Sequence, residues 1–241
     1  MEKVEWGWVV MGKPDQMQLW QKHWDSQCKK VHIINNNSGD TFGFPGSNRH
    51  FEFSGYQELI SQFRTDGPYL IANDTWFKTH SAVLWTVLLT RFLKKPKNDL
   101  SIYGDIRREA SSFEEKPSPY LSSWVFFIPN RKALEGFALS LEKAIFESSR
   151  ADFTAKYKQY VEDWIQPRNA LYGWHLAQLT SEALERKRQC IFMEHSLNKE
   201  LLREGFQLKG IGYNQKILYA LIRLVDRLQT RLFAWGLHPF A

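Results

Sequence analysis

The chain has 241 residues, enough for one domain, or one domain with a smaller addition, around a substantial core. Hydrophobic residues make up 43% and charged residues 24%, as in an ordinary globular protein. The charge of +6 comes from 32 basic residues interspersed with 26 acidic ones, without the clustered basic face of a nucleic-acid binder. We therefore predict no nucleic-acid partner, whereas nucleoside diphosphates or an acidic lipid surface fit this charge.

Cysteine usage and hydropathy predict the compartment. Cys28 and Cys190 are far apart and match neither a metal-ligand pair nor a disulfide framework, which predicts a reducing environment. The N-terminus does not resemble a signal peptide, and no apolar run approaches the ~20 residues of a membrane span. We therefore expect a cytoplasmic protein. The aromatic content of 15% fits a core, a sugar-stacking surface or an interface, and we expect mainly the core.

Short apolar strands and amphipathic helices alternate along the first 150 residues. Strands are predicted at Trp6–Met11, Val31–Ile34, Tyr69–Ala72, Leu100–Tyr103 and Leu121–Ile128. Helices are predicted at Asp15–Cys28, Phe51–Phe63, Ser81–Leu93 and Arg131–Phe146, with loops at Gly39–Arg49 and Arg107–Pro119. After Ala151 the pattern is nearly all helical, at Tyr157–Ile165, Leu176–Gln189 and Gln215–Ala234. We predict an α/β domain with a mostly parallel sheet over residues 1–150 and a helical extension packed on it over residues 151–241.

Two of these strands end abruptly in small polar and acidic residues. The first such segment is Ile33–Asp40, and the second is Leu70–Thr75. In open α/β sheets, ligands bind in the crevice beyond the carboxyl ends of the strands. We therefore expect both loops to line one site, suited to a nucleotide-linked substrate with a metal-bound diphosphate.

At these loops the chain resembles the inverting, family-two-like glycosyltransferases with the A-type nucleotide-diphospho-sugar fold. Ile34-Asn-Asn-Asn-Ser-Gly-Asp40 is similar to the family's strand end Val-Asp-Asn-Gly-Ser-Thr-Asp. Ser38 and Asp40 match that pattern, while Asn35 replaces the acidic residue that usually contacts the nucleobase. The replacement at Asn35 therefore leaves the choice among uracil, thymine and guanine open.

Three further motifs follow in the family's order, so the resemblance covers about residues 5–146. Gly46–Gly55 is similar to the loop that opens a helix, and Ile71–Thr75 stands where the family has Asp-X-Asp or Asn-Asp-Asp. Leu121–Leu134 looks like the acceptor-side segment of bacterial polysaccharide transferases, including rhamnan-type ones. Each motif alone is weak, and it is their order that carries the resemblance.

The resemblance implies roles for individual residues. Donor contacts are expected from Asn35, Asn36, Asn37, Ser38, Asp40, Asn48, Arg49 and Asn73. Asp74 is expected to hold Mg²⁺ or Mn²⁺, because a hard cation bound by one or two carboxylates neutralises the donor phosphates. Arg107, like Arg49, is a candidate for a phosphate contact. Ser122, Ser123 and Trp124 are expected on the acceptor side.

Inversion also needs a base that takes the proton of the acceptor hydroxyl. Asp105, Glu109 and Asp163 are the predicted catalytic residues, and Glu162 stands beside the last of them. Structural alternatives stay open for all of these carboxylates. Asp74 also suits the N-cap of a following helix, the consecutive asparagines suit a turn, and the others suit a solvated surface.

The C-terminal helix is predicted to be basic and amphipathic. Its apolar residues recur at helical spacing, at Leu218, Leu221, Ile222, Val225, Leu228, Leu232 and Phe233. Arg223, Arg227 and Arg231 form a second stripe, so residues 215–241 suit either an anionic membrane surface or packing on the domain or on a second subunit. We expect a mixed outcome, in which Leu218, Leu221 and Val225 pack and the segment Leu232–Phe240 meets lipid.

These observations predict an α/β glycosyltransferase of the A-type, Rossmann-like fold with a C-terminal helical extension. It would transfer a hexose or deoxyhexose from a nucleotide-diphospho-sugar to a glycan or lipid-linked glycan in bacterial surface polysaccharide synthesis. The alternative is a non-catalytic protein that kept the fold as a binding or scaffold module, since Asp74 is the only carboxylate of its motif. A sugar-nucleotide nucleotidyltransferase fits less well, because the N-terminus shows no Gly-rich activation loop with a lysine.

Overall fold

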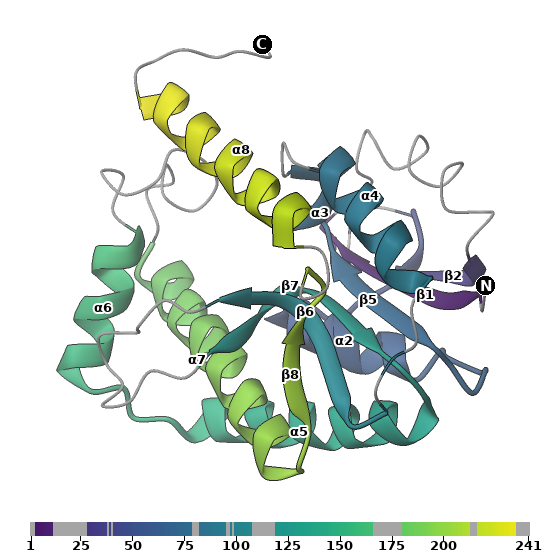
Figure 1. Cartoon of the computed structure of the whole chain (residues 1–241). Coiled ribbons are helices and arrows are strands. Elements are labelled where there is room, and N and C mark those ends of the chain that lie inside the picture. Colours follow the sequence, from purple (N-terminus) through teal and green to yellow (C-terminus); the bar gives the residue numbers. More distant parts are fainter. Residues whose placement is uncertain are drawn as a thin grey trace.

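The computed structural model describes residues 3–11, 28–37, 39, 41–78, 82–94, 97, 99–107, 119–165, 180–212 and 216–234, with the backbone alone at a few helical positions. In these residues a seven-stranded sheet lies between two layers of helices (Figure 1). The fold is therefore α/β, as the alternation of strands and helices predicts.

The sheet has the strand order β3-β2-β1-β5-β7-β6-β8. Its strands are β1 (Val4–Val10), β2 (Cys28–Asn35), β3 (Phe44–Pro45), β5 (Tyr69–Asn73), β6 (Ser101–Arg107), β7 (Tyr120–Ile128) and β8 (Gln207–Gly210). All neighbours pair in parallel except β7, which is antiparallel to both β5 and β6. The sheet is thus mixed but mostly parallel, compatible with a Rossmann-like fold. A further short strand, β4 (Arg49–Phe51), lies outside the sheet.

Helices cover both faces of the sheet. The helices are α2 (Glu52–Ile60), α3 (Thr75–Lys78), α4 (Ala82–Leu93), α5 (Arg131–Arg150), α6 (Ala155–Ile165), α7 (Ser181–Arg203) and α8 (Lys216–Ala234). One core cluster joins the sheet to α2, α5 and α7, and the other joins it to α3, α4 and α8. Helix α6 packs on α7 through a small third cluster. Fully buried Trp6, Trp76 and Trp85 confirm that much of the aromatic content serves the core.

The predicted strands and helices within the described residues are present, with several differences. Strand β3 lies within the predicted loop Gly39–Arg49, and α7 runs to Arg203, beyond the predicted end at Gln189. Cys28 begins β2 instead of ending a helix, and residues 12–27 lie outside the described part of the chain. The nearly all-helical pattern after Ala151 also missed β8, which pairs with β6 and extends the sheet. Four residues of mixed polarity after a long helix carry too little periodicity to identify a strand. The second half of the chain therefore contributes to the sheet itself.

Helix α2 packs closely on the central strand because of a glycine. A Cβ at Gly7 of β1 would lie 2.3 Å from Cδ2 of Leu59, well inside contact distance. Leu59 is fully buried at this point. The close approach fixes α2, and with it the residue at its N-terminus, against the sheet.

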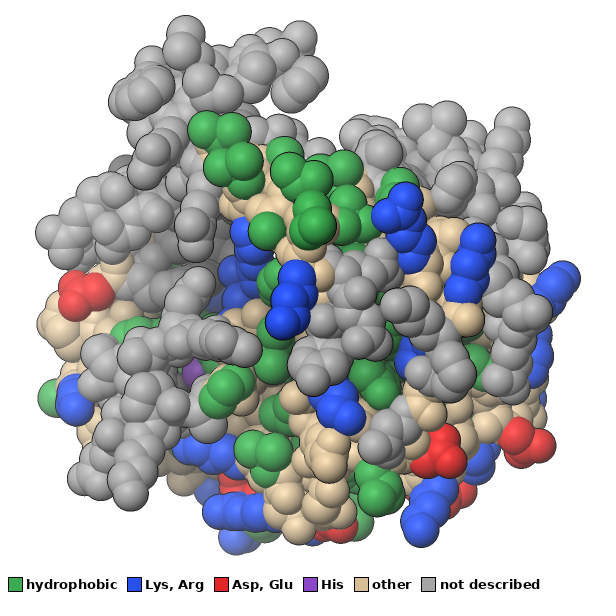
Figure 2. All heavy atoms as spheres, in the orientation of Figure 1, with side chains coloured by type: hydrophobic (Ala, Val, Ile, Leu, Met, Phe, Trp, Pro, Cys, Tyr) green, Lys and Arg blue, Asp and Glu red, His purple; other side chains and the backbone are tan. Residues whose placement is uncertain are grey.

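Helix α8 carries apolar side chains on two faces. Ile222 is fully buried, and Leu218 packs against the core, as predicted. Ile217, Leu221, Leu224 and Leu228 are instead exposed, so the prediction that Leu221 packs is wrong. Figure 2 shows apolar side chains gathered over this helix. Val225 is half-buried, and the side chains of the segment Leu232–Phe240 lie outside the described residues.

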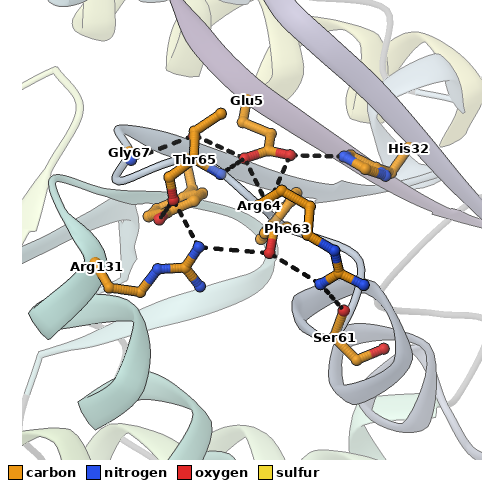
Figure 3. Close-up of polar contacts among 9 residues, drawn as sticks. Glu5, His32, Ser61, Phe63, Arg64, Thr65, Gly67 and Arg131 are labelled. Carbon is orange, nitrogen blue, oxygen red and sulfur yellow. Dashed lines mark hydrogen bonds and ion pairs between the residues drawn. The ribbon is translucent and has the colours of Figure 1, made fainter.

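The amino edge of the sheet is held by a buried carboxylate (Figure 3). Glu5 of β1 is fully buried and accepts hydrogen bonds from His32 Nε2 at 2.8 Å, Thr65 Oγ1 at 2.7 Å and the backbone N–H groups of Arg64 and Thr65. Arg131 of α5 donates to the carbonyls of Thr65 and Phe63. Burial raises the pKa of Glu5, but these hydrogen bonds together outweigh it and the net pKa is lowered. Glu5 thus joins β1, β2 and the loop before β5 at the edge opposite the candidate site.

Candidate functional site at the carboxyl edge of the sheet

The carboxyl ends of β1, β2 and β5 bring the two predicted loops together. The backbone N–H of Asn36 donates to Val10 at 2.8 Å, and that of Asp74 donates to Val9 at 3.1 Å. Both loops are therefore bonded to the end of the same strand, β1. The chain proceeds from β1 to β2 and β3 on one side and to β5 on the other, so this point is the topological switch of the sheet. Both loops thus lie at the end of β1 as expected, and that they line one ligand site stays a prediction.

The asparagines of the first loop mostly hold the loop itself. Asn35 is buried, donates through Nδ2 to the Phe42 carbonyl at 2.9 Å, and accepts from the Asn37 N–H through Oδ1. Asn36 is buried as well, and its Nδ2 donates to the Phe51 carbonyl at 2.9 Å. Asn37 alone of the three is exposed. Its side chain is thus the one of this group that a ligand in solvent can reach.

Other predicted donor-side residues occupy varied surroundings. Ser38 and Asp40 lie outside the described residues. Arg49 is exposed, and the half-buried Asn48 has its carbonyl bound by Arg186 at 3.2 Å. The structure gives Arg49 solvent access but does not place it beside the edge.

At the end of β5, Asn73 and not Asp74 accepts from the Thr75 N–H, at 3.0 Å. Asp74 is half-buried at the sheet edge. Among the described residues, no group of three or more His, Cys, Asp or Glu side chains could hold a metal ion. Asp74 supplies one hard oxygen donor, and Mg²⁺ commonly binds through one or two carboxylates together with waters and substrate phosphates. The residues present therefore fit a cation carried in with a diphosphate better than a site built wholly from protein ligands.

The antiparallel strand β7 brings the predicted acceptor-side residues to the same edge. Its register places Val125 opposite Ala72, so Ser123 and Trp124 lie beside the end of β5. Ser123 is buried and faces α2, where its Oγ donates to Glu52 at 3.1 Å. The Trp124 side chain is buried against Trp85 and Trp76 on the other face of the sheet. Ser122 is half-buried and pairs with Asp105.

A carboxylate that the sequence interpretation left without a role lies at the N-terminus of α2. Glu52 accepts from Ser123 Oγ, and the Cys190 Sγ of α7 lies 3.6 Å from both of its oxygens. Glu194, one turn along α7, accepts from the Ser123 N–H. We name Glu52, Ser123, Cys190 and Glu194 the Glu52 cluster. It joins α2, β7 and α7 at the carboxyl edge.

The surroundings of Glu52 raise its pKa. Burial of the carboxyl group is the largest cause; Lys187 and hydrogen bonds from the backbone N–H of Glu52 and from Ser123 act against it, and Glu194 reinforces it. Burial next to Glu52 also raises the pKa of the Cys190 thiol, so this cysteine is not an activated nucleophile. A carboxyl group whose pKa is raised by burial beside a second carboxylate is a candidate for proton transfer.

Tyr56 links the Glu52 cluster to the end of β5. Its hydroxyl donates to the Ser123 carbonyl at 2.5 Å. Burial, followed by the charge of Glu52, raises the pKa of Tyr56; hydrogen bonding with Asn73 opposes this, and Asp74 adds to it. The charges of Glu52 and Asp74 therefore both raise the pKa of Tyr56.

The backbone before Glu52 is held in an uncommon conformation. Phe51 has a φ of 50°, in the left-handed region that bulky residues rarely adopt. Its carbonyl is bound by Asn36, and the Arg186 guanidinium lies over its ring at 4.6 Å. The end of β2 and helix α7 thus hold the residue from which Glu52 projects. Asn36, predicted as a donor contact, is observed positioning this turn.

Asp105 is enclosed by partners. It is fully buried and binds Trp124 Nε1 at 3.0 Å, the Tyr219 hydroxyl at 2.7 Å, Arg223 at 2.7 Å and Arg107 at 2.8 Å. We name this group the Asp105 anchor, because it ties α8 to the end of β6. Arg223 and Arg107 neutralise the carboxylate, and four donors engage it, which disfavours Asp105 as a base open to an acceptor. The interpretation of Arg223 as a membrane-facing residue is wrong, and Arg107 faces Asp105.

The remaining predicted bases lie elsewhere. Asp163, on α6, accepts from Gln159 of the same helix at 3.0 Å. Its neighbour Glu162 pairs with Arg188 of α7, and Figure 1 shows α6 beside α7 at the outer side of the molecule. Glu109 lies outside the described residues. Unlike these residues, the Glu52 cluster includes Ser123, which lies beside the end of β5.

The sequence contained one signal for Glu52. It is an acidic residue at the start of a predicted amphipathic helix, within the segment Gly46–Gly55 that resembles the family's loop opening a helix. Such a residue is usually explained by the helix dipole alone. Its contacts with Cys190 and Ser123 span 138 and 71 residues and required the fold. Comparisons with models of protein families, with curated proteins and with solved structures gave no match.

Proposed function

We propose that the chain is an A-type glycosyltransferase that moves a hexose or deoxyhexose from a nucleotide-diphospho-sugar to a glycan or lipid-linked glycan in bacterial surface polysaccharide synthesis. The observation that carries the proposal is the bonding of both loops to the end of β1. It gathers Asn37 and Asp74 at the switch point of a mostly parallel sheet. Ligands of open α/β sheets bind at this position.

The donor diphosphate lies against the end of β5 in this proposal. Asp74 would hold Mg²⁺ or Mn²⁺, which when bound supplies positive charge to the departing diphosphate. Asn37 is the exposed amide available to the nucleoside. Asp74 faces this edge from a strand that β7 flanks, so donor and acceptor subsites adjoin.

The candidate base is Glu52. The acceptor hydroxyl oxygen attacks the anomeric carbon, the bond to the diphosphate breaks, and its electron pair leaves with the diphosphate. Glu52 takes the hydroxyl proton, and Ser123 and Glu194 position it. Attack from the face opposite the leaving group inverts the anomeric centre. A base of this kind contributes about 10²–10⁴-fold to the rate.

A non-catalytic binding or scaffold protein is the second candidate. It is favoured by the engagement of Asn35 and Asn36 in backbone hydrogen bonds and by the single carboxylate at the end of β5. The two candidates differ in turnover: a scaffold binds a nucleotide sugar or a glycan without releasing nucleoside diphosphate.

The test is a panel of UDP-, GDP- and dTDP-linked hexoses and deoxyhexoses, with and without Mn²⁺. A donor at a hundred times its dissociation constant stabilises the fold by about 2.7 kcal/mol. That corresponds to a rise in melting temperature of roughly 5–10 °C for a chain of this size. Nucleoside diphosphate released with a glycan acceptor is measured in parallel.

The variant Asp74→Asn should lose the Mn²⁺-dependent part of this stabilisation while keeping the fold. Asp99→Asn, at an exposed turn before β6, is the matched control and should behave as wild type. Lower stability of Asp74→Asn with unchanged donor affinity would assign Asp74 a structural role. No stabilisation by any donor would refute the proposed function.

A further inference from the structure

Helix α8 presents an apolar stripe to solvent. Its members are four exposed residues, Ile217, Leu221, Leu224 and Leu228, with 81%, 47%, 50% and 49% of their surface accessible. They follow one another at spacings of four, three and four residues, which places them on one side of a helix. The opposite side holds Ile222 in the core and Arg223 on Asp105. The stripe therefore faces outward because the Asp105 anchor fixes the rotation of the helix.

The charges around the stripe indicate what covers it. Apart from Arg223, which binds Asp105, helix α8 contains three basic residues, Lys216, Arg227 and Arg231, against one acidic residue, Asp226. The whole chain carries +6. In Figure 2, Lys and Arg side chains stand near the apolar group, while the Asp and Glu side chains drawn in red lie toward the left and bottom of the view. An apolar stripe in basic surroundings complements an anionic surface with an apolar interior.

The size of the stripe favours a bilayer over a second copy of the chain. Four partly exposed aliphatic side chains offer far less than the roughly 800 Å² per partner of a stable protein interface. A bilayer surface needs no such area, because lipid headgroups add about fivefold in affinity for each basic residue close to them. No helix among the described residues is long and apolar enough to cross a membrane. The expected geometry is thus a helix lying in the interface.

We propose that the outer face of α8 docks on the surface of a bilayer that contains anionic lipid. Ile217, Leu221, Leu224 and Leu228 enter the headgroup region, and the basic residues of the helix other than Arg223 contact lipid phosphates. The inference is independent of sugar transfer, since it depends on α8 alone.

The test is sedimentation of the full chain with two kinds of vesicle, neutral ones of phosphatidylcholine alone and anionic ones that also contain about 30% phosphatidylglycerol. Wild type should sediment with the anionic vesicles at low salt and be released as salt is raised. The double variant Leu221→Gln/Leu224→Gln should bind at least tenfold more weakly. Both side chains are exposed, so its melting temperature should match wild type.

The matched control is Leu139→Gln/Phe146→Gln, which removes two exposed apolar side chains from α5 on the other side of the sheet. It should bind anionic vesicles as wild type does. Light scattering should give a monomer for all three proteins. The proposal is overturned if wild type does not bind anionic vesicles at low salt, or if both double variants bind equally. A wild-type dimer that only Leu221→Gln/Leu224→Gln dissociates, without vesicle binding, would instead make the stripe an interface between copies.

Discussion

Replacing Asp105 with asparagine separates the two roles considered for this residue. As an anchor, Asp105 holds Arg223 and Tyr219 of α8 and Arg107 of its own strand. As a base, it would have to leave an oxygen open to the acceptor. Asp105→Asn keeps the shape of the side chain and removes its charge. The anchor therefore predicts a loss of stability, and the base predicts a loss of turnover alone.

The magnitude follows from the burial of the group. Removing one partner of a buried ion pair commonly costs about 3–5 kcal/mol. The Arg223 and Arg107 side chains are 23% and 30% exposed, so water partly replaces the lost carboxylate. We therefore expect the lower end of that range, about 3 kcal/mol, for Asp105→Asn. For a chain of this length this corresponds to a drop of roughly 6–12 °C in melting temperature.

Urea unfolding followed by far-ultraviolet circular dichroism measures this loss. Limited proteolysis adds a local readout, because weakening the anchor should expose helix α8 to cleavage. Asp163→Asn is the control: this half-exposed residue of α6 should change the unfolding free energy by less than about 0.5 kcal/mol. An Asp105→Asn protein as stable as wild type, with turnover reduced a hundredfold or more, would refute the anchor and restore Asp105 as the base.

Two further predictions concern Glu5 and Glu52. The folded-state pKa of Glu5 is lowered, so the stability that Glu5 contributes is present above its unfolded pKa and is lost as pH falls through the folded pKa. Glu5→Gln should therefore cost about 2–3 kcal/mol near pH 7 and flatten the acidic limb of a curve of stability against pH. An unchanged acidic limb would contradict this prediction. The folded-state pKa of Glu52 is raised, so its contribution is fully present below the unfolded pKa and is lost as pH rises through the folded pKa. Glu52→Gln should therefore gain stability relative to wild type as pH rises, while transfer slows by about 10²–10⁴-fold with little change in donor affinity. Wild-type turnover in Glu52→Gln would remove Glu52 from the mechanism.

Apolar periodicity predicted most of the fold because the strands and helices are buried in regular patterns. The run Tyr69–Asn73 is wholly buried, and helix α2 buries one face, so each carries a clear local signal. Strand β8 carries none, since only Gly210 among its four residues is fully buried. Its place beside β6 is set by tertiary pairing, which local propensity does not encode.

The candidate site also has parts that the sequence predicts and parts that it does not. The meeting of Asn36 and Asp74 was predictable, because parallel strands end at one edge of a sheet. The contacts of Asp105 with Tyr219 and Arg223, and those of Glu52 with Ser123 and Cys190, were not, because they join residues more than 70 positions apart. The sequence shows that a carboxylate is present, but only the fold shows whether arginines form ion pairs with it. For this reason Asp105 looked like a base and Glu52 did not.

Hydrogen–deuterium exchange with and without a donor tests the central claim most directly. The ligand would be the nucleotide sugar that stabilises the chain most in the panel, added with Mn²⁺ at a hundred times its dissociation constant. The account predicts slower exchange at residues 35–37 and 73–76, where the loops meet at the end of β1, and unchanged exchange around Glu5 and residues 64–67 at the opposite edge. Protection confined to the Glu5 edge, or none at residues 35–37 and 73–76 despite saturation, would contradict the placement of the site.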